Sequence, residues 1–321
     1  MDRLRVAVLD DYGAAARGSA DWAELSDVAE ITFFHDHLQQ HGALVERLAP
    51  FDVVVLERER TPFRRSLIEA LPRLKLIVST GPVNWSIDLA AAGERGIPVG
   101  CTEARQDLTP ELCMGLIVSL ARRITAEDRA VRAGHWQSGL GFAVAGSRLG
   151  LIGLGQVGTK LAHLARAFGM DVIAWSPNLT QERCEAAGVV LASREELLST
   201  SDVVSIHVVL GDRSRGSIDR TAIALMKPTA YLVNTSRGPI IVEQDLVAAL
   251  REQRIAGAAL DVFDVEPLPQ DHPLREFDNV ILTPHIGYIT REQCRFFYGQ
   301  VVAQIRSFAN GGPVRALGKP P

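Results

Sequence analysis

Short apolar runs alternate with segments of helical periodicity along most of the chain. This alternation is typical of parallel sheets, in which a crossover helix joins each strand to the next. In the first third, the pattern predicts strands at residues 5–9, 30–34, 52–56, 74–79 and 97–100, and helices at 43–48, 64–70 and 87–95.

A longer helical pattern covers residues 110–134. Thr109 is positioned to cap this helix, and Pro110 suits its first turn because a proline lacks the N–H that would be unsatisfied there. We interpret the helix as the bridge between a first domain and a second.

The second half of the chain repeats the alternation with clearer signals. A capping box, Ser193 to Glu196, opens a short helix. We expect the last helix to return to the first domain, and the tail 310–321 to be loosely ordered. Strands are predicted at 149–152, 172–175, 203–208, 230–234, 256–261 and 280–283, and longer helices at 159–168, 243–253 and 290–309.

A glycine-rich turn joins the strand at 149–152 to the helix that follows it, and reads Gly153-Leu154-Gly155-Gln156-Val157-Gly158. In this G-x-G-x-x-G pattern Gly153 permits the tight turn, Gly155 lets backbone amides approach a pyrophosphate, and Gly158 lets the helix pack on its strand. The helix N-terminus adds N–H groups for the phosphates. A P-loop is excluded, because Thr159 precedes Lys160 instead of following a lysine.

Composition describes an ordinary globular protein with room for two domains: 321 residues, 47% hydrophobic and 22% charged. The formal net charge of −4 argues against a nucleic-acid partner. The four cysteines form no C-x-x-C pair, so reduced thiols are favoured over disulfides or zinc. His35, His37 and His41 are interpreted as part of a solvated loop, and no metal site is expected.

The N-terminal stretch carries charges at Asp2, Arg3 and Arg5 before an apolar run that is too short for a signal peptide. No uncharged apolar run approaches the length of a membrane span. These features predict a soluble, cytoplasmic protein without a membrane partner.

Polar and ionisable side chains follow four successive predicted strands of the second half. Ligands of open parallel sheets bind at the carboxyl ends of the strands, so these side chains should converge where the dinucleotide binds. Taken singly, Arg237 fits a surface cation, Glu266 a turn residue and His285 a loop histidine; together they favour a site. The side chains at these strand ends are His207, Thr235, Ser236, Arg237, Asp261, Glu266 and His285.

Hydride transfer to a ketone requires this set of residue types. The ketone oxygen gains negative charge as the hydride arrives, and a histidine can deliver the proton near neutral pH. A carboxylate bonded to that histidine favours its charged form, which Glu266 could do for His285. A substrate carboxylate fits the guanidinium fork of Arg237, and Asp261 could hold the nicotinamide carboxamide.

The chain resembles the D-2-hydroxyacid dehydrogenase family over essentially its full length. The resemblance rests on residues 150–158 (GLIGLGQVG), 233–238 (VNTSRG), 257–267 (GAALDVFDVEP) and 283–287 (TPHIG). It implies an α/β fold with two doubly wound parallel sheets, and NAD(P)-dependent conversion between a small 2-oxo acid, such as glyoxylate or hydroxypyruvate, and the D-2-hydroxy acid. A Rossmann cofactor domain (103–290) is expected inside a discontinuous flavodoxin-like substrate domain (1–102 and 291–321).

The resemblance also implies roles for single residues. Arg237 would bind the substrate's carboxylate and carbonyl, and His285 would be the acid/base, tuned by Glu266. Asp261 and the Gly287 backbone would lie near the nicotinamide. The implied cofactor set is Gly153, Gly155, Gln156, Val157, Gly158, Ser176, His207, Thr235, Ser236, Asp261 and Gly287, and the implied substrate set is Arg60, Thr80, Gly81, Arg237 and His285.

The first third contributes a second implied part of the substrate site. Segment 79–88 resembles the family's substrate loop, whose backbone amides hold the carboxylate, and Thr80 and Gly81 match it best. Arg58 or Arg60 occurs where the family often has a residue lining the cleft. Members are commonly homodimers, with region 110–134 at the interface.

The chain departs from the family's pattern at Val83, in the substrate loop, and at Val209, after a predicted cofactor-binding residue. The substrate loop has Val83 where glycine is usual, after a stiff Pro82, so the accepted substrate can differ from the common ones. Val209 replaces the proline usual after His207, which weakens the role of that histidine.

The end of strand 172–175 is a third departure. An acid would be expected there to bond the ribose 2′-OH of NAD. The chain offers Ser176 and Asn178, which could bond either a hydroxyl or a phosphate. NAD and NADP are therefore both candidates, with no preference between them.

A second functional hypothesis is a dinucleotide-sensing binding protein, like the family's transcriptional co-repressors. It ranks below the enzyme because the chain has no appended region for recruiting partners. Oxidation of formate or phosphite ranks lower still, because the formate enzymes carry glutamine where this chain has Glu266.

Overall fold

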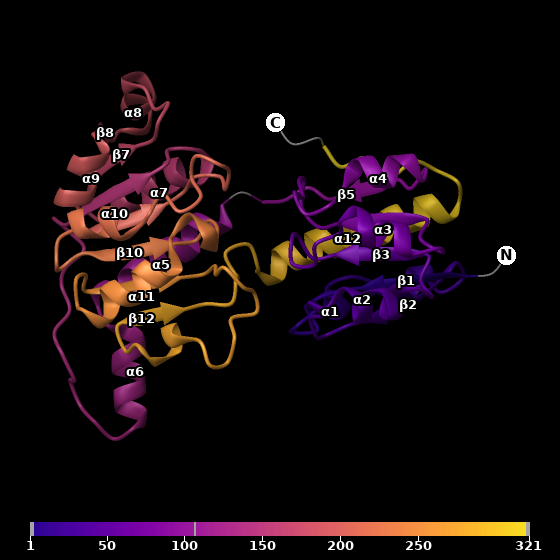
Figure 1. Cartoon of the computed structure of the whole chain (residues 1–321), viewed down its shortest axis with the longest axis horizontal. Helices are drawn as coiled ribbons and strands as arrows, with labels where there is room; N and C mark the ends of the chain where they lie inside the picture. The colour runs from indigo at the N-terminus through magenta and orange to yellow at the C-terminus, as the bar shows by residue number, and fades with distance from the viewer. Residues whose placement is uncertain (1–2, 106, 319–321) are drawn as a thin grey trace. The chain divides into compact units, whose positions relative to one another are not determined.

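Two parallel sheets organise the chain, which the computed structural model describes over residues 3–105 and 107–318. The chain divides into two compact units, residues 1–105 with 289–321 and residues 106–288 (Figure 1). The second unit is inserted between two stretches of the first, so the first unit is discontinuous in sequence. Within the described residues, none of the helices combines the length and apolar character that crossing a bilayer requires.

The first unit contains a five-stranded parallel sheet in the order β2-β1-β3-β4-β5, which is the flavodoxin-like order. The strands are β1 Leu4–Val8, β2 Ala29–Phe33, β3 Val53–Leu56, β4 Leu76–Ser79 and β5 Val99–Cys101. The helices are α1 Ala15–Ser19, η1 Trp22–Leu25, α2 His41–Leu48, α3 Arg65–Ala70, α4 Leu89–Glu94 and α12 Arg291–Ala309.

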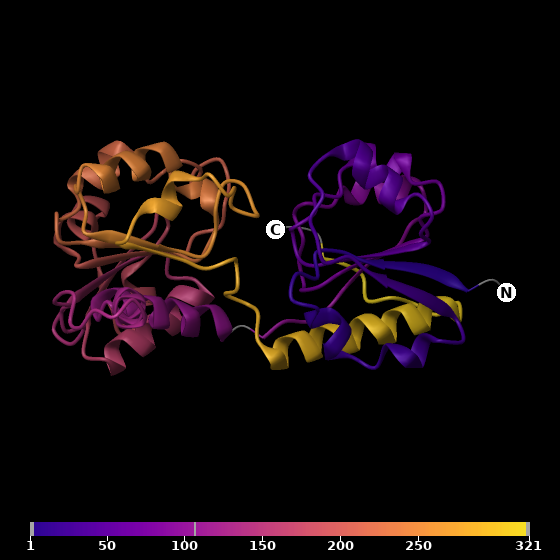
Figure 2. The same ribbon diagram turned by 90° about the horizontal axis from the view of Figure 1, so that it is seen from below.

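Helices cover both faces of this sheet, which explains why its central strand β3 (VVVL) is apolar and buried throughout instead of alternating. Buried side chains of α2, α3 and α4 pack on one face. On the other face α12 packs beside α1 and η1. Figure 2 shows the sheet of this unit between the two helical layers, with α12 in yellow along one of them.

The second unit contains a seven-stranded parallel sheet in the order β12-β11-β10-β9-β6-β7-β8. The order reverses at β6, as in a Rossmann fold with one added strand. The strands are β6 Arg148–Ile152, β7 Asp171–Trp175, β8 Val190–Leu191, β9 Val203–Ile206, β10 Tyr231–Asn234, β11 Gly257–Leu260 and β12 Val280–Leu282. The helices are α5 Leu108–Ala121, α6 Ile124–Arg132, α7 Gln156–Ala167, α8 Gln181–Ala187, α9 Arg194–Thr200, α10 Arg220–Leu225, η2 Gly238–Ile240, α11 Glu243–Arg251 and η3 Pro273–Glu276.

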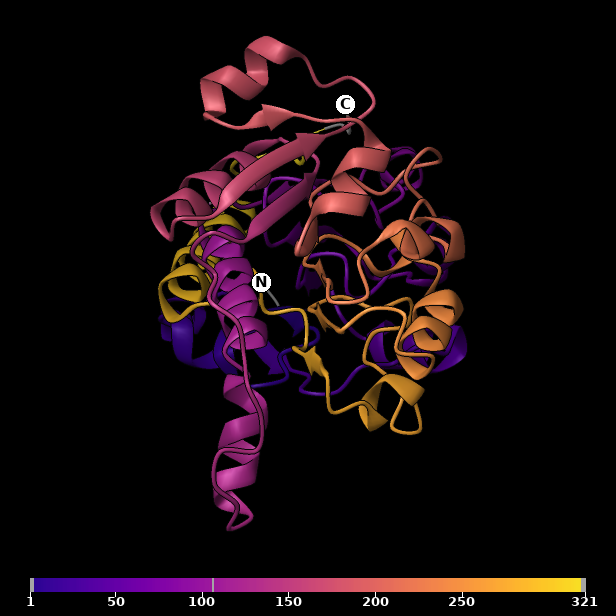
Figure 3. The ribbon, with the colours of Figure 1, turned by 90° about the vertical axis from the view of Figure 1, so that its left-hand side faces the viewer.

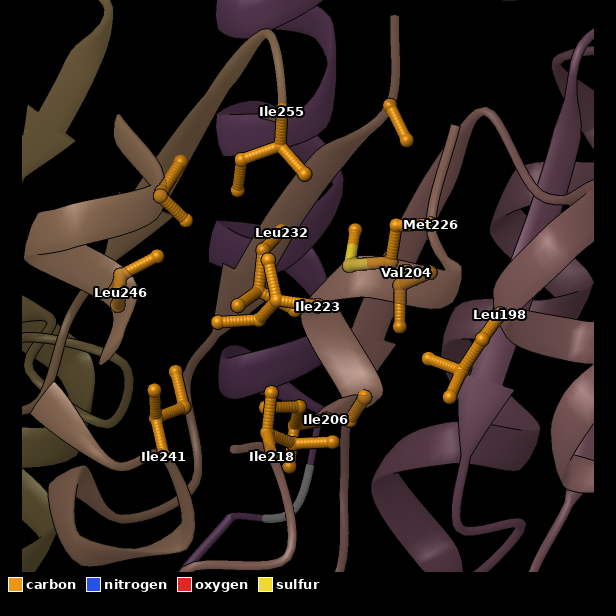
Figure 4. Close-up of a cluster of buried hydrophobic side chains, with 14 of the residues drawn as sticks. Leu198, Val204, Ile206, Ile218, Ile223, Met226, Leu232, Ile241, Leu246 and Ile255 are labelled. Atoms are coloured by element: carbon orange, nitrogen blue, oxygen red, sulfur yellow. The ribbon is translucent and has the colours of Figure 1, made fainter. Parts of the chain in front are cut away.

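Two apolar clusters fix this sheet between its helices. One joins the sheet to α9, α10 and α11, and Leu198, Ile223 and Leu246 bring one side chain from each of those helices into it (Figure 4). The other joins the sheet to α5, α7 and α8. The sheet's backbone is therefore held rigidly, and the loops at its carboxyl edge are free to carry polar side chains.

The single helix predicted over residues 110–134 is wrong, because α5 and α6 are separate helices. Arg123 has a left-handed backbone (φ 55°), which ends the helical path. The carbonyl of Ala121 accepts the N–H of Phe142 (2.8 Å), so the chain returning from α6 satisfies the end of α5. Figure 3 shows α6 and that returning chain extending away from the sheet of the second unit.

Two smaller expectations are also wrong. Thr109 lies inside α5, whose N-cap is Asp107, and its hydroxyl donates to the Gly287 carbonyl (3.0 Å) instead of capping. The tail is not loose at 315–317: Cys101 N–H donates to the Arg315 carbonyl and Leu317 N–H to the Val99 carbonyl, both at 2.9 Å. Pairing with the edge strand β5 outweighs the tail's glycine and proline content, while residues 319–321 lie outside the described part.

Candidate functional site

The glycine-rich turn has the geometry that a dinucleotide requires. A Cβ on Gly153 (φ +103°) would lie 2.6 Å from the His207 carbonyl oxygen, and one on Gly158 would lie 2.2 Å from the Gly153 carbonyl oxygen. At Gly155, by contrast, a Cβ would meet nothing within 4 Å. The protein itself therefore requires glycine at 153 and 158, while the open space at 155 fits a ligand's close approach at the N-terminus of α7.

This contrast predicts different outcomes for two matched substitutions. Gly158→Ala is expected to destabilise the fold by about 1–3 kcal/mol through overpacking. Gly155→Ala, at a backbone conformation that alanine tolerates, is expected to leave unfolding unchanged and to weaken dinucleotide binding about tenfold or more. Thermal unfolding and ligand titration of both variants test this. Full dinucleotide affinity in Gly155→Ala would contradict it.

Arg237 lies in the turn after β10, and Asn234 shapes that turn. The Asn234 side chain accepts the Ser236 N–H and donates to the Arg237 carbonyl, both at 3.0 Å. A Cβ on Gly238 would lie 2.1 Å from the backbone of Phe263, so only glycine allows the two loops to approach this closely. This contact brings the loop of Arg237 against the loop that carries Glu266.

Glu266 and His285 form a direct pair. His285 Nδ1 lies 2.6 Å from Glu266 Oε2, while Glu266 Oε1 accepts the Phe263 N–H (2.9 Å). Burial by itself would raise the pKa of Glu266, but the hydrogen bond and charge of His285, with the charge of Arg237, hold this pKa below its ordinary value. Glu266 is therefore a carboxylate at neutral pH, and it fixes the orientation of the imidazole ring.

Asp261 organises the loop on which His285 is mounted. Its Oδ1 accepts the Thr283 hydroxyl (2.6 Å) and the Ile286 N–H (2.8 Å), and its Oδ2 accepts the Gly287 N–H (2.8 Å). Burial raises the pKa of Asp261, although these hydrogen bonds oppose the rise. The bonds bracket His285, whose backbone is left-handed (φ 53°), and so hold it in a conformation that histidine rarely adopts.

His207 lies beneath the glycine-rich turn. Its ring Nε2 is 2.8 Å from the Ser205 hydroxyl, and its backbone N–H donates to the Ile152 carbonyl (2.8 Å). Burial lowers the pKa of His207 to about 4, so the ring is neutral. Burial likewise raises the pKa of the neighbouring Cys113 thiol to about 11. These contacts show that His207 supports the glycine-rich turn from within the protein.

The remaining side chains of the predicted cofactor set lie at the same edge. Thr235 is buried. The Ser236 hydroxyl donates to the Val208 carbonyl (2.5 Å) and ties the end of β10 to the end of β9. Gln156 and Val157 open α7, and Ser176 directly follows β7.

In the first unit, Thr80 and Gly81 follow β4. The Thr80 N–H donates to the Leu56 carbonyl (2.9 Å), and the Gly81 N–H donates to the Thr102 hydroxyl (2.7 Å). The resemblance implied that amides of this segment hold a carboxylate, but these two amides already have acceptors within the unit. The expectation is therefore wrong for their N–H groups, because Leu56 and Thr102 satisfy them first.

Two arginines follow β3, and Arg58 contacts this segment. The Arg58 guanidinium covers Gly81, where a Cβ would lie 1.9 Å from Nη1, and the Arg58 N–H donates to the Thr80 hydroxyl (3.0 Å). Arg60 donates to the Asp10 carbonyl (3.0 Å) and its guanidinium lies over the Tyr12 ring. Both cations therefore sit at the carboxyl edge of the first unit's sheet.

Sequence reasoning missed Asn84, which holds the segment together. Its amide donates to the Arg58 carbonyl and to the Ser79 hydroxyl, and its Oδ1 accepts the Ser86 N–H and hydroxyl. These bonds fix the backbone of the segment on either side of Asn84. An asparagine two residues before a serine was the available signal, since such pairs form local turns.

The comparisons with known proteins agree with this geometry. The family model for the D-isomer specific 2-hydroxyacid dehydrogenase, NAD binding domain, matches residues 114–287, more than half of the chain. The chain is 39% identical over 272 residues to D-3-phosphoglycerate dehydrogenase of Methanocaldococcus jannaschii, covering 84% of this chain and 52% of that protein. It is 30% identical to hydroxypyruvate reductase of Blautia hydrogenotrophica, covering 98% of this chain and all of the relative.

Among solved structures, the chain is similar to a putative D-3-phosphoglycerate dehydrogenase oxidoreductase from Ralstonia solanacearum. The TM-score is 0.91 at 36% identity, covering 98% of this chain and 96% of that one. The chain spans about half the length of the D-3-phosphoglycerate dehydrogenases it matches. The chain belongs to the D-isomer specific 2-hydroxyacid dehydrogenase family, which confirms the resemblance inferred from its motifs and the two-sheet α/β fold.

Proposed function

We propose that the protein is an NAD(P)-dependent D-2-hydroxyacid dehydrogenase, which transfers a hydride between the nicotinamide and a small 2-oxo or D-2-hydroxy acid. The observation that carries this proposal is the 2.6 Å pair of His285 and Glu266, at the same sheet edge as Arg237 and the glycine-rich turn. Relatives named glyoxylate reductase and hydroxypyruvate reductase support a small 2-oxo acid as the substrate.

His285 is the proposed general acid. Its Nδ1 faces Glu266, so its other ring nitrogen, Nε2, is left to hand a proton to the substrate oxygen during reduction. The Glu266 carboxylate stabilises the imidazolium that supplies this proton and accepts no proton itself. Bound reduced dinucleotide supplies the hydride. In oxidation His285 takes the proton back from the hydroxyl group.

Arg237 is the proposed anchor of the substrate carboxylate, because a guanidinium binds a carboxylate through two parallel hydrogen bonds. In the first unit, Arg60 is proposed as a further substrate-binding residue. For the dinucleotide, the amides of Gly155, Gln156 and Val157 would bind the pyrophosphate, and Thr235 and Ser236 would line its path. Asp261 and Gly287 would lie beside the nicotinamide, with Asp261 keeping the His285 loop in shape.

Turnover across a panel of 2-oxo acids tests the proposal. Purified protein is mixed with NADH or NADPH and with glyoxylate, hydroxypyruvate, pyruvate or 3-phosphohydroxypyruvate, and the absorbance of the reduced nicotinamide is followed. A fall that depends on the oxo acid is the expected result. No turnover with any acid under either dinucleotide would overturn the proposal. The comparisons give no support to the alternative of a dinucleotide-sensing co-repressor.

We also propose that two copies of the chain associate through the arm formed by α6 and residues 133–142. No residue of α6 is buried, and the arm exposes large apolar side chains. Their exposed fractions are 50% for Ile124, 51% for Val131, 80% for Trp136 and 98% for Leu140. Exposed apolar side chains grouped in this way mark an interaction surface, and covering them with the same arm of a second copy gives a closed symmetric dimer.

The double substitution Trp136→Glu with Leu140→Glu is expected to convert this dimer to a monomer, because it introduces charge into the apolar contact. Light scattering after size exclusion measures the mass directly. Val190→Glu, at a 57% exposed apolar position of the edge strand β8, is the matched control and should remain dimeric. A monomeric wild-type protein would refute the interface.

The proposed compartment is the cytoplasm, where thiols such as the four free cysteines stay reduced.

A further inference from the structure

The carboxyl end of β7 lacks the residue that selects NAD. In Rossmann folds a carboxylate about 20 residues past the glycines accepts the ribose 2′-OH of NAD, and it would repel the 2′-phosphate of NADP. Here residues 176–180 are Ser-Pro-Asn-Leu-Thr, without an acid. Ser176 is half-buried and Asn178 is exposed, so both are within reach of a ligand at this edge.

The next helix brings a guanidinium to the same place. Arg183, in the first turn of α8, donates from Nη2 to the carbonyl of Leu154 (2.9 Å), inside the glycine-rich turn. The bond fixes the side chain against the glycine-rich turn, and the Gly153 N–H of the same turn donates to the carbonyl of Trp175 at the strand end (2.8 Å). A guanidinium has five N–H donors, and among the described residues the Leu154 carbonyl is the one acceptor of this guanidinium.

A second arginine, Arg194, adds positive charge at the end of β7. The Arg194 guanidinium lies 5.9 Å from the centre of the Trp175 ring, at the last residue of β7, and donates to the Ser217 carbonyl (2.6 Å). The acids of α8 are engaged locally: Glu185 accepts from Gln181 (2.9 Å), and amides of its own turn lower the pKa of Glu182. In the described part of the chain, neither acid forms an ion pair with Arg183.

We propose that the chain selects NADP(H) over NAD(H), and that Arg183 is the residue that determines this specificity by binding the 2′-phosphate. Ser176 is the second contact, as a hydroxyl donor to the same group. The inference rests on the proposed function and names its cofactor. A phosphate monoester carries about −1.5 to −2 charge at neutral pH, and a pre-positioned guanidinium fork is its best protein partner.

The test measures binding without turnover, by calorimetric titration with NADPH, NADH, 2′,5′-ADP and 5′-AMP. Wild-type protein is expected to bind NADPH and 2′,5′-ADP about 10- to 100-fold more tightly than their partners without the 2′-phosphate, as a charge-assisted hydrogen bond implies. Arg183→Gln is expected to remove most of this preference and to leave NADH affinity within about twofold. Arg220→Gln, which removes an exposed guanidinium from α10, is the control and should bind all four ligands normally.

The converse substitution, Ser176→Asp, restores the missing acid and is expected to reverse the preference toward NADH. Tighter wild-type binding of NADH than of NADPH would overturn the inference. So would equal weakening of all four ligands by Arg183→Gln, which would mean that this arginine merely ties α8 to the turn. Selective NADPH binding without turnover of any oxo acid would overturn the proposed function alone, whereas binding of neither dinucleotide would overturn both.

Discussion

His285→Asn is expected to lower kcat by about 10²–10⁴-fold while dinucleotide affinity stays unchanged, because it removes the proposed proton donor. Asparagine is the informative replacement, since it tolerates the left-handed backbone of this position (φ 53°) better than most residues. The loop itself is held by Asp261, so it should keep its shape without the imidazole. Steady-state kinetics with a reactive oxo acid, combined with dinucleotide titration, measures both quantities.

The matched control is His272→Asn. His272 also faces a carboxylate in the second unit, with Nε2 2.9 Å from Glu243 Oε1, and its Nδ1 accepts the Leu274 N–H. Asparagine can retain the local cap, so this variant should keep wild-type kcat. Near-normal turnover in His285→Asn would show that another group delivers the proton.

Arg237→Lys is expected to reduce kcat/KM for the oxo acid by about 10²–10³-fold, through loss of the two-point contact with the substrate carboxylate. The bond and charge of His285 are the main causes that lower the pKa of Glu266, and lysine keeps the charge that Arg237 adds to them, but lysine cannot supply parallel N–H donors. The loss should therefore appear mainly in KM, with the dinucleotide affinity retained.

Arg237→Ala should lose more activity than Arg237→Lys, and added guanidinium ion should restore part of it by occupying the vacated volume. A substrate analogue whose carboxylate is replaced by an amide should be turned over equally poorly by wild type and by Arg237→Ala. Unchanged KM in both variants would contradict the role of Arg237 as the carboxylate anchor.

The sequence predicted that Arg237, Glu266 and His285 lie at one sheet edge, because this prediction depended on few physical rules. Strands with both faces buried are apolar throughout, so their positions were visible, and parallel strands bring their carboxyl ends to one edge. Arg237, Glu266 and His285 therefore could be grouped although they are far apart in the chain. The pairing of Glu266 with His285 followed from their chemistry, and the 2.6 Å contact agrees with it.

Features that depend on tertiary contacts could not be predicted. The helical path breaks between α5 and α6 at the left-handed Arg123, and the Phe142 N–H takes the Ala121 carbonyl, a bond that no local pattern encodes. The acceptors of the Thr80 and Gly81 amides likewise come from β3 and from Thr102, which follows β5. Arg183 is eight residues beyond β7, and its contact with Leu154 depends on the path of the chain between them, which the sequence pattern does not predict.

Asp261 shows how a correct position can carry an incomplete interpretation. The motif indicated an acid at the end of β11, and its chemistry suggested a contact with the nicotinamide. In the structure both carboxylate oxygens of Asp261 hold the loop of His285. They do so because the buried carboxylate is surrounded by three hydrogen-bond donors.

The most direct test of the account follows the hydride itself. NADPH that carries deuterium at the transferable position of the nicotinamide is incubated with the protein and hydroxypyruvate or glyoxylate, and the product is examined by mass spectrometry and chiral chromatography. The account predicts deuterium on the carbon that bears the new hydroxyl group and, from hydroxypyruvate, the D-hydroxy acid alone. Product without deuterium, or the L-hydroxy acid, would contradict it.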